Sequence, residues 1–273
     1  MVLSRSTEPV AGRSGRLFGS CVLAFVAVFV LFFVALVIAD ITAINLEAVA
    51  EVLRSPQIRA ATWLSIWTSV VSVILVLIFA IPMGYALSRY RFPGHVLVDS
   101  IVDLPIIFPP LIVGLSLLVF FQTPPGRWIE ELGLEFVYQK KGIILCQFLV
   151  SASFGIRAAK STFDDIDPRL EHVALTLGCS RAEAFLRVAL PMAKNGIIAG
   201  AILAWARAFG IFGPLMVFVG AVRMRTEVLP TTIYLEQSIG RIEVAIAVAL
   251  LMLTLAIIAL VSLRMVIGGK RLW

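Results

Sequence analysis

Charged side chains are scarce in this sequence of 273 residues. Asp, Glu, Lys and Arg make up 15% of it, whereas 60% of the residues are hydrophobic and the mean hydropathy is +1.00. Soluble domains usually contain about 25% charged and about 45–50% apolar residues. A soluble fold of this length could bury only part of such apolar content, so water cannot be the only solvent. The composition excludes an ordinary soluble enzyme and a disordered chain, and it indicates an integral membrane protein.

Residues that build metal sites and disulfide frameworks are also few. The chain has two histidines and three cysteines, and neither type occurs with the spacing of a metal site or a disulfide scaffold. There is no Gly-x-Ser-x-Gly nucleophile motif. The segment 155–161 lacks the second glycine of a phosphate-binding loop and does not follow a predicted strand. We therefore expect this chain to have no catalytic residue and to bind no metal or cofactor itself.

Long apolar segments dominate the chain. A helix that crosses a bilayer needs about 20 largely apolar residues. Prolines and glycines interrupt the third and fifth of the segments listed below, which is tolerated only where the freed backbone groups face protein or a wet cavity. The sequence thus predicts an all-α integral membrane protein with six transmembrane helices and a pathway through it. The six segments are 17–39, 60–88, 97–121, 142–160, 195–221 and 242–267.

The distribution of basic residues predicts the orientation in the membrane. With the N-terminus in the cytoplasm, fourteen Lys and Arg residues fall on the cytoplasmic side and eight on the opposite side. Because basic loops favour the cytoplasm, we expect both termini there, in a cell inner or plasma membrane. The net charge of +6 then reflects the orientation of the chain in the membrane, where its partners include membrane lipids. It does not indicate binding to nucleic acid. The expected organisation is a cytoplasmic tail over 1–16 and one membrane domain over 17–273.

The sizeable polar segment lies between the fourth and fifth spans, on the expected cytoplasmic side. An Asp-Pro pair at 167–168 is typical of a helix start, and Gly178 is typical of the turn that ends it. Capping-box spacing over 180–183 predicts a second short helix, which bends at Pro191 into the fifth span. We name this segment the 164–191 loop. The first helix carries one apolar stripe, Leu170, Val173, Ala174 and Leu177, and a polar loop tip follows, consisting of Thr176, Gly178, Cys179, Ser180 and Arg181.

The 164–191 loop resembles the EAA loop in the membrane subunits of bacterial type I ABC importers. The usual form is Glu-Ala-Ala, three residues, Gly, nine residues and Ile-x-Leu-Pro. Here nine residues follow Gly178 before Val-Ala-Leu-Pro at 188–191, and His172 occupies the position of the usual Glu. Other segments resemble the molybdate/sulfate branch of that family, over about residues 60–265. These segments are 104–114, 167–171, 206–213 and 225–234, and Ile211 stands where the branch commonly has an acidic residue.

The resemblance implies a type I ABC importer transmembrane domain, the permease subunit of a binding-protein-dependent importer. It implies a homodimer, two ATPase subunits that bind ATP and Mg²⁺, and an extracytoplasmic solute-binding protein. The implied cargo is a small oxyanion, either molybdate or tungstate, or sulfate. The alternative within this architecture is another cargo such as thiamine, ferric iron or a polyamine. A further alternative is a channel or secondary transporter that needs no ATP, which inverted repeats and intramembrane acids would favour. A third class, an intramembrane enzyme, would need a nucleophile or a set of metal ligands in the spans.

The resemblance also assigns contact with the ATPase subunit to the 164–191 loop. The implied contact residues are Glu171, His172, Ala174, Thr176, Gly178, Ser180, Arg181, Leu190 and Pro191.

Few residues within the spans indicate a pathway. Arg207 is the one basic residue left inside a span, and such a residue usually faces a bundle interior or a wet cavity. It is either a partner for an oxyanion or a donor to backbone carbonyls. Asp99 and Asp103 share one helix face near the inner end of the third span, where we expect solvation or pairing with basic loop residues. The other pathway candidates are Ser151, Ser153, Pro109 and Gly210.

Overall fold

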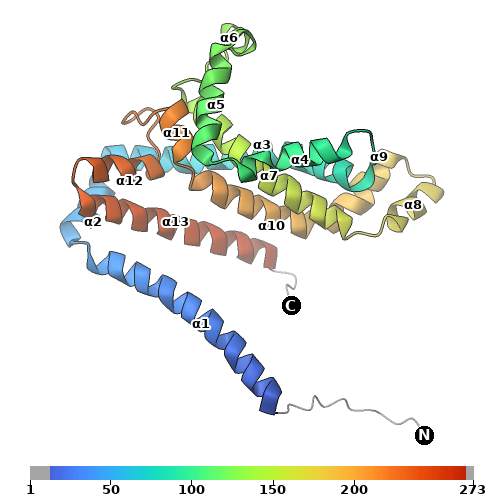
Figure 1. Ribbon diagram of the computed structural model, residues 1–273, viewed down its shortest axis with the longest axis horizontal. Helices are drawn as coiled ribbons and strands as arrows, with labels where there is room; N and C mark the ends of the chain where they lie inside the picture. The colour runs from blue at the N-terminus through green and yellow to red at the C-terminus, as the bar shows by residue number, and fades with distance from the viewer. Residues whose placement is uncertain (1–12, 269–273) are drawn as a thin grey trace.

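The computed structural model describes residues 13–268, and within this range all regular elements are helices (Figure 1). The first twelve residues of the expected tail over 1–16 lie outside the described residues. Four long helices run side by side along the long axis of the molecule. They are α3 (Pro56–Arg89), α7 (Lys140–Asp164), α10 (Leu190–Phe209) and α13 (Ile242–Gly268). A fifth long helix, α1 (Arg13–Thr42), diverges from this body toward its N-terminal end (Figure 1).

Shorter helices lie at the two ends of the long ones and beside them. At the end that carries the 164–191 loop are α8 (Arg169–Thr176) and α9 (Arg181–Ala184), followed by a π-turn over Phe185–Ala189. The opposite end carries α2 (Leu46–Arg54) and α12 (Leu229–Ser238). The remaining short helices are α4 (His95–Ile107), α5 (Pro110–Gln122), α6 (Pro124–Glu131) and α11 (Gly213–Phe218).

Among residues 13–268, five helices are long and apolar enough to cross a membrane, and the number is six if α4 and α5 form one crossing. The third segment differs from the prediction, because the expected single span over 97–121 is two helices bent by 111°. Two prolines in succession explain the bend. Phe108 precedes Pro109 and has extended backbone angles, as does Pro109 before Pro110, because a residue before proline disfavours the helical region.

The fifth segment also differs from the prediction. The expected span over 195–221 ends at Phe209, and α11 begins only at Gly213. At its other end the helix has no break at Pro191, since it runs continuously from Arg181 to Phe209. A π-turn directly precedes the proline, and there the backbone N–H of Leu190 donates to the carbonyl of Phe185, five residues earlier. The wider turn lets the helix continue through Pro191.

The helices α3, α7 and α10 form a tightly packed three-helix core. Glycines lie where these helices touch. A Cβ atom added to Gly84 would lie 2.7 Å from Cβ of Ala159 and 2.8 Å from the backbone N of Lys160, and one added to Gly200 would lie 2.5 Å from Cβ of Ala158. Small residues allow membrane helices to approach this closely, so the three helices pack as one unit.

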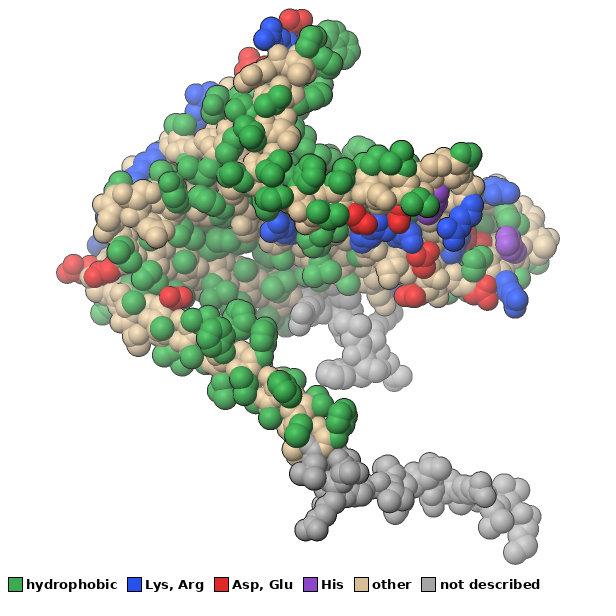
Figure 2. All heavy atoms as spheres, viewed as in Figure 1, with side chains coloured by type: hydrophobic (Ala, Val, Ile, Leu, Met, Phe, Trp, Pro, Cys, Tyr) green, Lys and Arg blue, Asp and Glu red, His purple; other side chains and the backbone are tan. Residues whose placement is uncertain are grey.

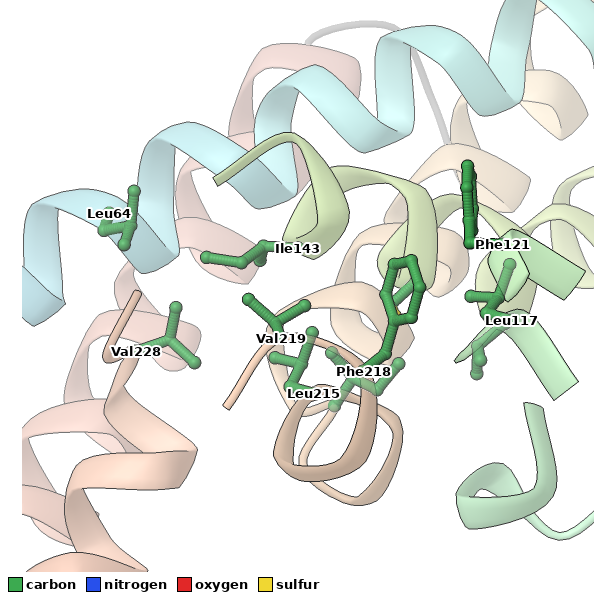
Figure 3. Close-up of a cluster of buried hydrophobic side chains, with 11 residues drawn as sticks. Leu64, Leu117, Phe121, Ile143, Leu215, Phe218, Val219 and Val228 are labelled. Atoms are coloured by element: carbon green, nitrogen blue, oxygen red, sulfur yellow. The ribbon is translucent and has the colours of Figure 1, made fainter. Parts of the chain in front are cut away.

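A cluster of buried hydrophobic side chains joins α5 and α11 to the three-helix core (Figure 3). It contains Leu64, Leu117, Phe121, Ile143, Leu215, Phe218, Val219 and Val228, together with Ile211. Within this region a Cβ added to Gly213 would lie 3.5 Å from the backbone N of Leu111, and one added to Gly114 would lie 2.6 Å from Pro214. The breaks in the third and fifth segments therefore lie side by side.

An ion-pair cluster fastens α4 to α7. The guanidinium of Arg157 donates to the carboxylate of Asp99 at 2.7 Å and to both carboxylate oxygens of Asp103 at 2.5 Å. It also donates to the backbone carbonyl of Asp99. The predicted pairing of the two aspartates is thus confirmed, although their basic partner belongs to α7 and not to a loop.

Replacing Gly84 with alanine should destabilise the three-helix core, because the added methyl group meets the backbone of α7. Overpacking of this kind typically costs about 1–3 kcal/mol, so the thermal denaturation midpoint in detergent should fall. Gly19→Ala is the matched control, since Gly19 also lies in a helix and a Cβ added there meets nothing within 4 Å. Equal midpoints for the two variants would contradict the close contact between α3 and α7.

Candidate functional site

The 164–191 loop folds as the sequence predicts, into a helix, a glycine turn and a second helix. The carboxylate of Asp167 accepts a hydrogen bond from the backbone N–H of Arg169 at 2.9 Å, at the start of α8. Gly178 has a φ of +96°, a left-handed conformation that glycine adopts without strain. The backbone N–H of Gly178 donates to Leu175 and that of Cys179 to Ala174, so the turn satisfies carbonyls at the end of α8.

A capping box begins α9, as its spacing predicts. The hydroxyl of Ser180 accepts from the backbone N–H of Glu183 at 3.3 Å, and the carboxylate of Glu183 accepts from the backbone N–H of Ser180 at 2.9 Å. These bonds satisfy two backbone donors that have no partner within the helix. The loop tip is therefore a defined structure with an exposed surface.

The apolar stripe of α8 is not a buried face. Only Ala174 is buried, whereas Val173 is 56% exposed and Leu177 is 80% exposed. His172 and Arg181 are exposed beside them. Figure 2 shows that charged side chains gather at this end of the molecule, in contrast to the hydrophobic surface along the long helices. An exposed apolar patch with a polar rim is typical of a protein interaction site.

Glu171 departs from the expectation that it contacts a partner at the surface. Its side chain is 9% exposed, and its carboxylate faces α3. Nε of Arg89 donates to one carboxylate oxygen at 2.8 Å, and the hydroxyl of Tyr85 donates to the other at 2.5 Å. The reason is the geometry of α8, because Glu171 and the buried Ala174 lie three residues apart on the face turned toward the core.

Arg89 and Tyr85 are functional candidates that sequence reasoning missed. Arg89 is one of the fourteen Lys and Arg residues on the expected cytoplasmic side, and the distribution of basic residues gave it no other role. A tyrosine and an arginine four residues apart at the end of an apolar span lie on one helix face, and this spacing could have indicated a pair of donors for a carboxylate. A cavity of about 210 Å³ lies between the end of α3 and the loop, and its lining includes Tyr85, Tyr90, His172 and Arg181.

The remaining loop candidates divide into exposed and supporting residues. The exposed ones, His172, Thr176, Gly178, Ser180 and Arg181, lie together around the loop tip. Ala174 is buried and Leu190 is half-buried, so both support the loop from within. Pro191 is exposed on the continuous helix that leads into α10.

Arg207 lies near the end of α10 and is half-buried. Its guanidinium carbon lies 5.9 Å from the centre of the Phe154 ring, within the range of a cation–π contact. Its Nε is buried and has no hydrogen-bond partner among the described residues. The interpretation of Arg207 as a donor to backbone carbonyls is therefore not supported in this part of the chain.

The other pathway candidates differ in burial. Ser151 is buried and donates to the carbonyl of Gln147 in its own helix, and Ser153 is buried on another face of α7. Pro109 and Gly210 are exposed at the two adjacent helix breaks. Within residues 13–268, no group of His, Cys, Asp and Glu side chains is arranged to hold a metal ion.

Known proteins of similar structure share this architecture. An ABC transporter for import of the acidic polysaccharide alginate matches 94% of this chain and 98% of its own, with a TM-score of 0.77 and 17% identity. The MetNI methionine ABC transporter matches 77% of this chain and 95% of its own, with a TM-score of 0.63 and 18% identity. At these identities the likeness establishes the fold.

Sequence comparison identifies the family. Residues 77–271 match the family described as binding-protein-dependent transport system inner membrane component. The molybdate/tungstate permease WtpB of Thermococcus kodakarensis is 35% identical over 89% of this chain and 93% of its own length. The Escherichia coli molybdenum permease ModB is 33% identical over 77% and 93%, and the Escherichia coli sulfate permease CysT is 30% identical over 78% of each chain. The chain therefore belongs to the family of binding-protein-dependent transport system inner membrane components, which are permease subunits of ABC transporters.

Proposed function

We propose that this chain is the permease of an importer that moves a small oxyanion into the cytoplasm, driven by ATP hydrolysis in a separate subunit. The observation that carries the proposal is the exposed, structured loop tip, held against the three-helix core of a membrane protein. The relatives named for molybdate, tungstate and sulfate support the class of cargo. A molybdate or tungstate ion is the preferred cargo, and sulfate is the related alternative.

In this proposal two copies of the chain form a homodimer around the pathway. Two ATPase subunits bind the 164–191 loops in the cytoplasm, where both termini also lie, and a solute-binding protein delivers the cargo to the opposite face. The ATPase subunits supply ATP and Mg²⁺ chemistry, and this chain supplies the pathway. ATP-driven closure of the ATPase pair then moves the loops, and the membrane helices follow as rigid bodies.

The surface of the 164–191 loop indicates the chemistry of its partner. Val173 and Leu177 present an apolar patch, and His172 and Arg181 add basic character beside it. A matching ATPase surface has an apolar groove with acidic residues at its edge. His172 in place of the usual Glu changes the charge at this contact, so the partner of this chain should differ there from partners of loops with an acidic residue.

Arg207 is the residue we assign to the cargo. A cation within a span whose Nε has no acceptor among the described residues can pair with a passing anion without first breaking an internal bond. The cation–π contact with Phe154 holds the guanidinium in place. Ile211 is buried in the apolar cluster beside the helix breaks, so no acidic side chain repels an anion at this position.

Gly178→Val should uncouple ATP hydrolysis from transport and leave the membrane domain folded. A Cβ at this position meets nothing within 4 Å, so the cost is the left-handed backbone, about 1–2 kcal/mol. That amount shifts a conformational equilibrium by a factor of roughly 5–30. Gly133→Val is the control, because Gly133 has a φ of +81° and equally open surroundings in another loop. Transport per ATP hydrolysed, measured in proteoliposomes, should fall only for Gly178→Val, and an unchanged ratio would count against a coupling role for the turn.

Leu177→Asp should weaken binding of the ATPase subunits, because it places a charge on the exposed apolar patch. Loss of an apolar interface anchor costs about 1–2 kcal/mol or more, which corresponds to roughly 5- to 30-fold in Kd. Leu132→Asp is the control, since Leu132 is similarly exposed in a loop beyond α6. Titration of labelled ATPase subunits onto the protein in nanodiscs measures the change. Equal affinities for the two variants would exclude Leu177 from the contact.

Vesicles that contain this chain, the ATPase subunits and the binding protein should take up labelled molybdate only when ATP is present. Tungstate should compete, and sulfate should compete to the extent that the pathway accepts it. Arg207→Met should slow the uptake of molybdate, because the cation that meets the anion is removed. ATP hydrolysis that this chain stimulates without uptake of molybdate would support the role of the chain as a permease and would reject molybdate as its cargo. Unaltered uptake by Arg207→Met would reject the contact between Arg207 and the anion.

A further inference from the structure

We propose that Glu171 is a positioning residue for energy coupling. Its buried carboxylate fixes α8 to α3, so that a displacement imposed at the loop tip reaches the three-helix core. We name the contacts of Glu171 with Arg89 and Tyr85 the Glu171 anchor. The inference rests on the proposed function of the chain, since it assigns the residue that transmits the movement of the ATPase subunits.

The geometry of the Glu171 anchor uses both carboxylate oxygens. One oxygen accepts from Nε of Arg89 at 2.8 Å and the other from the hydroxyl of Tyr85 at 2.5 Å. Arg89 also donates, through Nη2, to the carbonyl of Ile166 at 2.9 Å. The end of α3 therefore holds the loop at two points, one on α8 and one on the segment that leads into it.

Aromatic rings pack around Tyr85 on one side of the Glu171 anchor, and the anchor residues also line the 210 Å³ cavity. The ring of Tyr85 lies 4.6 Å from that of Phe185, 5.3 Å from that of Phe163 and 6.2 Å from that of Tyr90, measured between ring centres. The side chains of Arg89 and Glu171 are 10% and 9% exposed. In such surroundings a paired charge is held strongly, and removal of one partner leaves the other charge buried and uncompensated.

Along the chain, α8 is joined to the neighbouring helices through two short segments. On either side of α8 lie short non-helical segments, 165–168 toward α7 and 177–180 toward α9. These segments are held by turn hydrogen bonds, and they transmit a displacement of α8 less directly than a side chain that is bonded to α3. The Glu171 anchor bypasses both segments and connects α8 directly to α3, which is packed against α7 through Gly84.

Burial separates this role from docking. Because Glu171 is buried and faces α3, a partner at the loop tip does not meet its carboxylate. Loss of the carboxylate should therefore change how the loop moves and leave the affinity for the ATPase subunits unchanged. A docking residue such as Leu177 should show the reverse pattern.

The first test measures amide hydrogen exchange of the full chain in nanodiscs, without partners. Glu171→Gln should increase exchange over residues 169–176 and leave the buried parts of α7 and α10 unchanged. Glu183→Gln is the matched control, because the carboxylate of Glu183 bonds to Ser180 and Arg187 on its own helix and a glutamine preserves the capping box. Unchanged exchange over 169–176 in Glu171→Gln would overturn the anchor, whether or not the chain transports an oxyanion.

The second test measures the uptake of labelled molybdate per ATP hydrolysed in proteoliposomes with the ATPase subunits and the binding protein. Glu171→Gln should lower this ratio roughly tenfold, which corresponds to about 1.4 kcal/mol, while the Kd for the ATPase subunits stays constant. The double variant Arg89→Glu with Glu171→Arg swaps the two charges, and it should restore part of the molybdate uptake per ATP hydrolysed. A parallel loss of ATPase affinity, or an unchanged ratio, would overturn the positioning role. Absence of ATP-driven uptake by the unaltered chain would instead reject the proposed function. The hydrogen-exchange experiment alone would then decide whether Glu171 holds α8 against α3.

Discussion

The close approach of α3, α7 and α10 is the constraint on which the other features of this protein depend. In a bilayer the lipid tails are as apolar as the helices, so helices associate through close packing and not through the hydrophobic effect. Gly84 and Gly200 provide that packing, because each removes the side chain that would hold two helices apart. Only at this separation can groups at the end of α3 reach the loop that leaves α7.

Two arginines near the membrane domain form ion pairs that join separate helices. Arg157 satisfies both aspartates of α4, and Arg89 satisfies Glu171. Unpaired charges in such surroundings are costly, and these pairings also join helices that the chain connects only distantly. Arg207 differs from these two arginines, because its Nε is buried and lacks an acceptor within the described residues. An unpaired Nε in a membrane span is consistent with a site that an anion completes transiently.

Local chemistry made part of this structure predictable. The long apolar segments required helices, and the glycine turn and capping box followed from residues within a few positions of each other. The 111° bend at Pro109 and Pro110 was marked by its residues, but its angle depends on the packing of α5 against α11. The burial of Glu171 could not be predicted, because its partners lie more than 80 residues earlier in the chain. Its neighbour His172, next in sequence, is exposed, so sequence position alone does not separate the two roles.

The π-turn over Phe185–Ala189 sets the rotational register between the loop tip and the membrane helix. Each residue of an α-helix turns the chain by about 100°, and a π-turn accommodates one additional residue within a single turn. The direction in which α9 presents Arg181 is therefore determined by a helix that continues to Phe209, and not by a flexible connection. Loss of one residue from this turn would convert it to an ordinary α-helical turn and aim the same side chains in another direction around the helix axis, with every residue of the tip still present.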